Sequence, residues 1–136
     1  MLSKPAILAL VLVISLLSAP ALAAPLRFAA KDAAPGQATL EIQADELVTM
    51  SPLPFRLFLK DAAGKPLTGA KVDCALSMPS MAMPENRPKV IEHDGAYLGE
   101  MILTCTMGDW RMTCEAAGAT GKHWIMNFDI GTARMK

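Results

Sequence analysis

The chain has few of the residues that build most enzyme active sites. Of its 136 residues, two are histidine, one is tyrosine and two are tryptophan. No serine stands in a G-x-S-x-G pattern, and the sequence contains no H-E-x-x-H, P-loop or G-x-G-x-x-G motif. The cluster Glu92-His93-Asp94 offers acid–base groups, but neighbouring residues on a strand point to opposite faces and cannot converge. We therefore expect no enzymatic activity.

An excess of charge of either sign is also absent. Thirteen lysine and arginine residues balance thirteen aspartate and glutamate residues, and neither sign forms a run. Binding to the phosphate backbone of a nucleic acid, or to an anionic lipid surface, depends on clustered cationic side chains. We therefore expect the chain to bind neither a nucleic acid nor an anionic lipid surface.

The sequence has no apolar run of the length that a spanning helix needs, roughly 20 residues. Lys4 precedes a shorter apolar stretch over residues 5–17, and Ala21-Leu22-Ala23 matches the A-x-A pattern that signal peptidase recognises. Residues 1–23 are thus predicted to be a cleavable signal peptide, which makes the chain a periplasmic protein with no membrane span after processing. The alternative is a retained anchor, since no charge interrupts the apolar stretch.

Three cysteines follow the predicted signal peptide, so an oxidising compartment would permit a disulfide. The odd number leaves at least one thiol unpaired. None lies in a C-x-x-C motif or at zinc-finger spacing from a histidine, which argues against a thioredoxin-like site and a zinc site.

Beyond residue 37 the sequence alternates between apolar and polar residues, whereas residues 24–37 are rich in alanine and proline and are predicted to be a flexible leader. Turn residues separate the alternating segments, and none has a helical period. We expect a single all-β domain over residues 38–132, a seven-stranded antiparallel β-sandwich. Its strands are predicted within residues 39–44, 55–59, 72–78, 89–93, 97–105, 110–114 and 124–130.

Four motifs carry a resemblance to a known family. They are K-D-A-A-G-K-P-L-T-G-A-K-V at 60–72, M-P-S-M-A-M-P at 78–84, G-A-Y-L-G at 95–99 and M-G-D-W at 107–110. In this order they resemble the YtkA-like family, which is related to the FixH proteins. The resemblance implies an immunoglobulin-like sandwich in the bacterial cell envelope, with relatives tied to cation pumps and cytochrome oxidase assembly. It therefore suggests an envelope protein as partner.

If the strands follow the immunoglobulin order, the third and sixth are antiparallel neighbours in one sheet. Cys74 lies four residues before Met78, and Cys114 lies four residues after Trp110, so the two cysteines are expected at matching heights on adjacent strands. We predict a Cys74–Cys114 disulfide with Cys105 as a free thiol. The alternative is three buried reduced thiols that pack as small apolar groups.

The same strand directions place the loop carrying Met78, Met81 and Met83 at one end of the sandwich, together with the corner that carries Met107. Thioether sulfur is a soft ligand that suits Cu(I), so these four methionines are the predicted metal site. Two alternatives remain. Methionine also fills irregular gaps in a core, and an adaptable methionine surface can dock on a protein partner, which would make the chain an interaction or scaffold module.

A secondary metal site would use His93, His123 and Met126, with Met101 nearby in the sequence pattern. This set resembles the histidine and methionine pattern of periplasmic copper chaperones, although its spacing differs and Met101 is expected to face the core. The site requires the two histidines to be adjacent. The alternative is that each is a solvated residue at a strand end.

Overall fold

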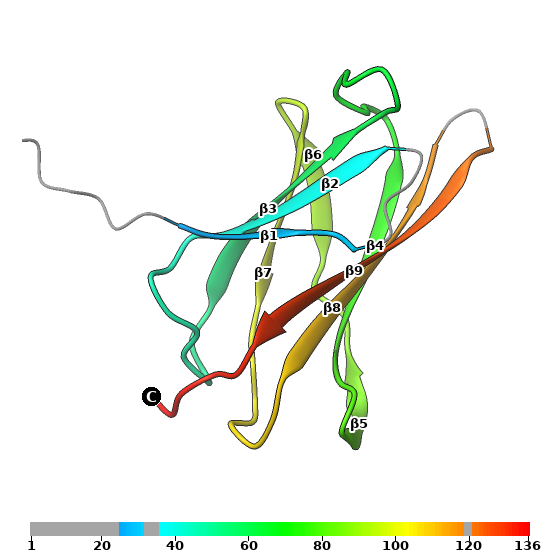
Figure 1. Cartoon of the computed structure of the whole chain (residues 1–136). Coiled ribbons are helices and arrows are strands. Elements are labelled where there is room, and N and C mark those ends of the chain that lie inside the picture. Colours follow the sequence, from blue (N-terminus) through cyan, green and yellow to red (C-terminus); the bar gives the residue numbers. More distant parts are fainter. Residues whose placement is uncertain (1–24, 32–35, 119–120) are drawn as a thin grey trace, which may run out of the picture.

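The computed structural model describes residues 25–31, 36–118 and 121–136, and this part of the chain is built from nine strands without a helix (Figure 1). All strand pairs within the sheets are antiparallel. The strands are β1 (Leu26–Ala29), β2 (Gln37–Ile42), β3 (Leu53–Lys60), β4 (Lys71–Met78), β5 (Met81–Asn86), β6 (Val90–His93), β7 (Ala96–Met101), β8 (Trp110–Ala117) and β9 (His123–Gly131).

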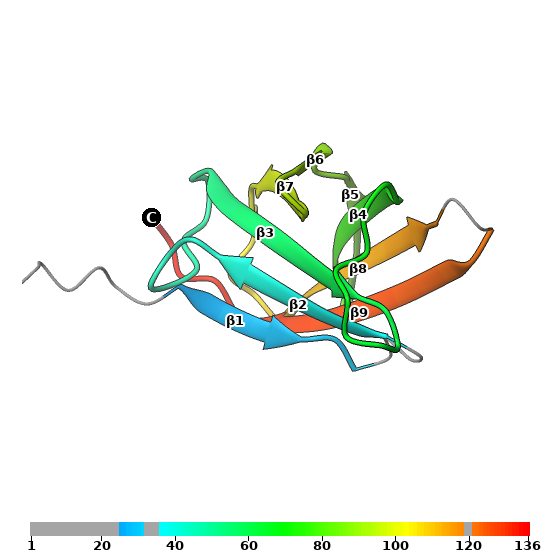
Figure 2. The same cartoon turned by 90° about the horizontal axis from the view of Figure 1, so that it is seen from above.

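Two sheets form the domain, one in the order β1-β2-β3-β7-β6 and the other in the order β5-β4-β8-β9. Seen from above, β1 and β9 lie along one edge of the sandwich, and β6 lies over β4 toward the other (Figure 2). The prediction of an all-β sandwich is confirmed. The predicted signal peptide, residues 1–23, lies outside the described residues. Within the described ranges there is no helix long and apolar enough to cross a membrane.

Alternation of side chains builds the core between the sheets. Along β3 the inward residues Leu53, Phe55, Leu57 and Leu59 are buried, and along β8 every second residue from Trp110 to Ala116 is buried. Because side chains on a strand alternate between its two faces, this period of two leaves each sheet with one apolar face to bury. The expected strand over residues 97–105 is shorter in the structure, where β7 ends at Met101.

The prediction of a flexible leader is wrong for residues 26–29, which form β1 and pair with β2. Leu26 and Phe28 pack against the core, and Arg27 lies 3.2 Å from the carboxylate of Glu41. The alternation over four residues was too short to distinguish from the surrounding alanine-rich and proline-rich sequence. Pairing with β2 supplies the hydrogen bonds that make so short a segment a strand.

The predicted end of the domain at residue 132 is also too early. Ala133 is buried, and the backbone N–H of Arg134 donates to the carbonyl oxygen of Leu47 at 2.9 Å. The carbonyl of Arg134 in turn accepts a hydrogen bond from Thr49 at 3.0 Å. The last residues therefore belong to the sandwich and fasten the segment that leads into β3.

Residues 81–86, predicted as part of a loop, form β5 instead. Pro84 is unusual within a strand, because proline cannot donate to a sheet. In the structure β5 is the outermost strand of its sheet and is paired only with β4, so one of its sides needs no partner. An edge position is where a sheet tolerates proline.

The single tyrosine ties the β3–β4 connection to β7. The hydroxyl of Tyr97 donates to the carbonyl oxygen of Leu67 at 2.9 Å and accepts from the backbone N–H of Ala70 at 3.1 Å. Burial raises the pKa of Tyr97, while the hydrogen bond from Ala70 opposes that shift. The phenol therefore keeps its proton at neutral pH and remains a donor.

We expect Tyr97→Phe to lower the free energy of unfolding by about 1–3 kcal/mol, because two part-buried backbone groups lose their partner. Urea denaturation followed by circular dichroism measures this loss. The raised pKa also gives a direction with pH: the stability from the neutral phenol is complete below the phenol's unfolded pKa and declines as pH rises above it. An unchanged urea midpoint would show that water replaces the hydroxyl at no cost.

Candidate metal centre

The β4–β5 hairpin carries three of the four predicted ligands. β4 alternates until Met78, whose side chain is 2% exposed and belongs to the core, and Met81 is its direct partner across the hairpin. Directly opposite residues on antiparallel strands extend to the same face. Met81 is 44% exposed because the hairpin extends past the end of the core. The packing interpretation therefore accounts for Met78, while Met81 is accessible to solvent.

Met83 lies two residues beyond Met81 on β5 and is half-buried against the core. It lines a hollow of about 450 Å³ together with Ile102 and Thr104, which follow β7. A hydrogen bond of 2.9 Å from Asn86 Nδ2 to the carbonyl oxygen of Ile102 joins the two walls. The hairpin is thus held against the segment that leads to the fourth methionine.

Met107 occupies the connection between β7 and β8 and is 80% exposed. This connection lies directly against the hairpin tip. A Cβ placed on Gly108 would lie 3.1 Å from the Cε methyl of Met78 and 2.9 Å from Ser80 Oγ, so the backbone here lies close to both side chains of the hairpin. The structure therefore brings all four methionines to one end of the sandwich, two of them exposed, one half-buried and one in the core.

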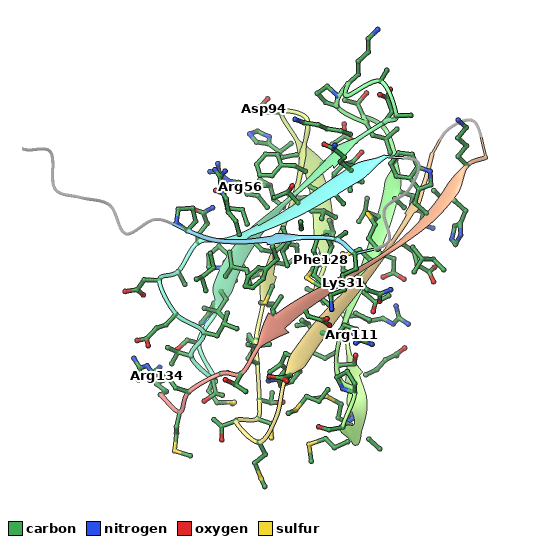
Figure 3. The ribbon with its side chains drawn as sticks, in the orientation of Figure 1. Lys31, Arg56, Asp94, Arg111, Phe128 and Arg134 are labelled. Atoms are coloured by element: carbon green, nitrogen blue, oxygen red, sulfur yellow. A yellow bond between two sulfur atoms is a disulfide. The ribbon has the colours of Figure 1, made fainter. Side chains whose placement is uncertain are left out.

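Further methionines at this end were not singled out by the sequence analysis. Met50 is 63% exposed, and its backbone N–H donates to the carbonyl oxygen of Leu103 at 2.8 Å. Met135 is 73% exposed and follows Arg134, which Figure 3 places at the same end. Several sulfur-containing side chains extend from this end in Figure 3. The sequence shows ten methionines. It does not show that Met50 and Met135 lie at this end, because contacts with residues distant in the sequence place them there.

Two carboxylates near the methionines are engaged by cationic side chains. Asp129 accepts hydrogen bonds from Lys31 and from Arg111 Nε, the latter at 2.9 Å, and these two contacts hold the pKa of its carboxyl below its usual range (Figure 3). Glu85 is bound by Arg87 Nε at 2.7 Å. In the described part of the chain, no three histidine, cysteine, aspartate or glutamate side chains are grouped so as to hold a metal ion. The ligands at this end are therefore the soft sulfur atoms of the methionines, with the single carboxylate of Asp109 beside them in the β7–β8 connection.

The structure does not assemble the secondary site. His93 ends β6 in one sheet and lies 3.1 Å from Asp94, whereas His123 begins β9 in the other sheet and lies 3.6 Å from Glu115. β6 and β9 occupy opposite edges of the sandwich. Met126 is fully buried. The two histidines are therefore not adjacent, because His93 belongs to a strand of one sheet and His123 to a strand of the other. Met101 is likewise fully buried, as its parity predicted.

Cys74 and Cys114 are direct partners in the register of β4 and β8, with Cα atoms 4.1 Å apart, and the structure joins them in a disulfide. The matching heights expected from the strand directions are present. Cys105 is free and half-buried. Its Sγ accepts a hydrogen bond from the backbone N–H of Met107, and its carbonyl oxygen accepts one from Trp110 Nε1.

No family model matches this chain, and neither a curated protein nor a solved structure matches it.

Proposed function

We propose that this chain is an exported, immunoglobulin-like protein of the YtkA-like and FixH-like group that binds Cu(I) in the bacterial periplasm. The strand order supports the immunoglobulin-like assignment: β2-β3-β7-β6 and β4-β8-β9 correspond to the A-B-E-D and C-F-G sheets of that fold. In this proposal β5 is an added strand beside β4, and β1 is an added strand beside β2.

The observation that carries the copper proposal is the contact between two separate methionine-bearing segments. The hairpin supplies Met81 and Met83, and the β7–β8 connection supplies Met107 and lies against Met78 through Gly108. Thioethers are neutral and soft, which favours Cu(I) over Zn(II) and Cu(II). Because they carry no proton to lose, their binding is expected to persist at mildly acidic pH. Delivery of copper to a cation pump or to an oxidase under assembly would fit such a site.

Replacing both Met81 and Met83 by leucine should weaken Cu(I) binding more than roughly 10–100-fold. That range is the loss of metal affinity when only a hydrogen-bond partner of a ligand is removed, and here two ligands are lost. Leucine nearly preserves the volume of methionine, so the packing should survive. The measurement is an anaerobic Cu(I) titration against a competing chelator. The protein is expressed from the full sequence, residues 1–136. Met112→Leu, a fully buried residue of β8, is the matched control and should bind as the wild type does.

A second candidate function is supported by the exposure of the same end. Met50, Met81, Met107 and Met135 present large apolar side chains to solvent, and adaptable methionine surfaces suit docking on a protein partner. Equal Cu(I) affinities for the wild type and for the variant with both leucines would contradict the copper proposal. The chain would then be better described as an interaction or scaffold module for an envelope protein.

A further inference from the structure

Exposure divides the methionines of the described chain into two groups. Four are between 44% and 80% exposed and lie at one end of the sandwich, here called the methionine end: Met50, Met81, Met107 and Met135. Four others are buried in the core and are at most 2% exposed: Met78, Met101, Met112 and Met126. Within the described ranges, exposed methionine therefore occurs at a single end of the molecule.

Sulfur gives these exposed positions a reactivity that other apolar side chains lack. Exposed isoleucines elsewhere on the surface, such as Ile91 and Ile125, are inert to mild oxidants. A methionine thioether is oxidised to the sulfoxide, and reductases reverse the reaction. Because the oxidant must reach the sulfur, accessible methionines react first, and core methionines are reached only when the domain opens.

We propose that Met81 and Met107 are sites of reversible sulfoxidation, and that this modification ends Cu(I) binding while the sandwich stays folded. The inference rests on the proposed function, in which both residues are ligands. Met81 is 44% exposed on the β4–β5 hairpin, and Met107 is 80% exposed in the β7–β8 connection. One oxidant in solution therefore reaches ligands on both of the segments that form the site.

Oxidation changes what the side chain offers to a metal ion. The sulfoxide presents an oxygen atom, which is a hard donor, in place of the soft thioether sulfur. Cu(I) prefers soft ligands, so the sulfoxide is a poor replacement. Asp109, the carboxylate of the β7–β8 connection, is likewise an oxygen donor and does not restore the lost softness.

The contacts that hold the methionine end together do not use the exposed sulfur atoms. Met50 is held by its backbone N–H, which donates to the carbonyl oxygen of Leu103 at 2.8 Å. The hairpin is held by Asn86, whose Nδ2 donates to the carbonyl oxygen of Ile102 at 2.9 Å. A sulfoxide oxygen at an exposed position is hydrated by solvent, so no unpaired polar group is buried. The domain should therefore remain folded after oxidation.

The modification is a two-electron transfer of oxygen from a peroxide. A lone pair of the thioether sulfur attacks one oxygen of hydrogen peroxide, and the O–O bond breaks. The proton on the transferred oxygen passes to the departing hydroxide. The sulfur is thereby oxidised to the sulfoxide and the peroxide is reduced to water, with no further reactant.

The test compares the purified, copper-free protein before and after treatment with dilute hydrogen peroxide. Tandem mass spectrometry should find sulfoxide at the exposed methionines and intact thioether at the buried ones, with an unchanged circular dichroism spectrum. After removal of the peroxide, the Cu(I) affinity in an anaerobic chelator competition should be lower by more than roughly 10–100-fold, since two ligands are lost. Methionine sulfoxide reductases for both epimers should restore it.

Cys105→Ser is the matched control, because Cys105 is the free thiol of the described chain and peroxide also oxidises thiols. This variant should lose and regain Cu(I) binding as the wild type does. Retention of Cu(I) binding by the peroxide-treated variant would show that the thiol, and not the methionines, carries the effect, and would overturn the inference.

The remaining outcomes separate this inference from the proposed function. Sulfoxide at the core methionines, or unfolding on oxidation, would overturn the inference and leave the copper site untouched. Unchanged Cu(I) affinity with Met81 and Met107 fully oxidised would also overturn it, and the variant with leucine at positions 81 and 83 would then decide the proposed function alone. Failure of the untreated protein to bind Cu(I) would overturn both.

Discussion

Trp110→Ala should lower the free energy of unfolding by about 3–5 kcal/mol, the range found when a buried large side chain is cut back to alanine. Trp110 is fully buried where β8 begins, and its indole N–H donates to the carbonyl oxygen of Cys105 at 2.9 Å. The substitution opens a cavity and also leaves that carbonyl without its partner. Chemical denaturation monitored by circular dichroism measures the loss.

Trp110→Phe separates the two contributions. Phenylalanine keeps most of the apolar volume but has no N–H, so the expected loss falls to about 1–3 kcal/mol. The same variant should loosen the connection that carries Cys105 and Met107. A stability of Trp110→Ala within roughly 0.5 kcal/mol of the wild type, as for an exposed position, would contradict the placement of this side chain in the core.

Removing the Cys74–Cys114 disulfide should lower the free energy of unfolding by about 4 kcal/mol on the chain-entropy estimate for the loop it closes. The two cysteines are 40 residues apart in the sequence and are paired directly across β4 and β8. The double variant with alanine at both positions, or the wild type in a reductant, should show the loss. Alanine suits the site because both side chains are fully buried and a hydroxyl there would lack a partner.

Cys105→Ser is the matched control for the disulfide. It removes the free thiol and should leave the effect of a reductant on stability unchanged. Peptide mapping without reduction then identifies the linkage. A bridge through Cys105, or three free thiols in the purified protein, would contradict the pairing.

Several features of the fold follow from local pattern alone. The alternation of buried and exposed residues along β3, β4, β8 and β9 reflects the two faces of a strand, and so the strands could be found without knowing their neighbours. The strand directions then predicted the matching heights of Cys74 and Cys114, which are present in the register. The grouping of Met78 with Met107 at one end was predicted in the same way and is also present.

Other features depended on contacts that no local pattern contains. β1 is a strand because β2 lies beside it, and β5 is a strand because an edge position tolerates Pro84. The burial of Met78, in contrast to the exposure of Met81, depends on where the core ends along the hairpin. Met50 is held at the methionine end by its hydrogen bond to Leu103, a residue more than 50 positions later.

The sequence by itself thus determined an all-β chain with its sulfur-bearing residues concentrated in a few segments, because the period of hydrophobicity and the identity of side chains are local properties. Only the tertiary structure decided which of those sulfur atoms are accessible, and which histidines are kept apart. It also directed the backbone N–H of Met107 at the sulfur of Cys105. Exposure and the direction of a hydrogen bond are set by what packs against a residue, and the partners here come from strands far away in the sequence.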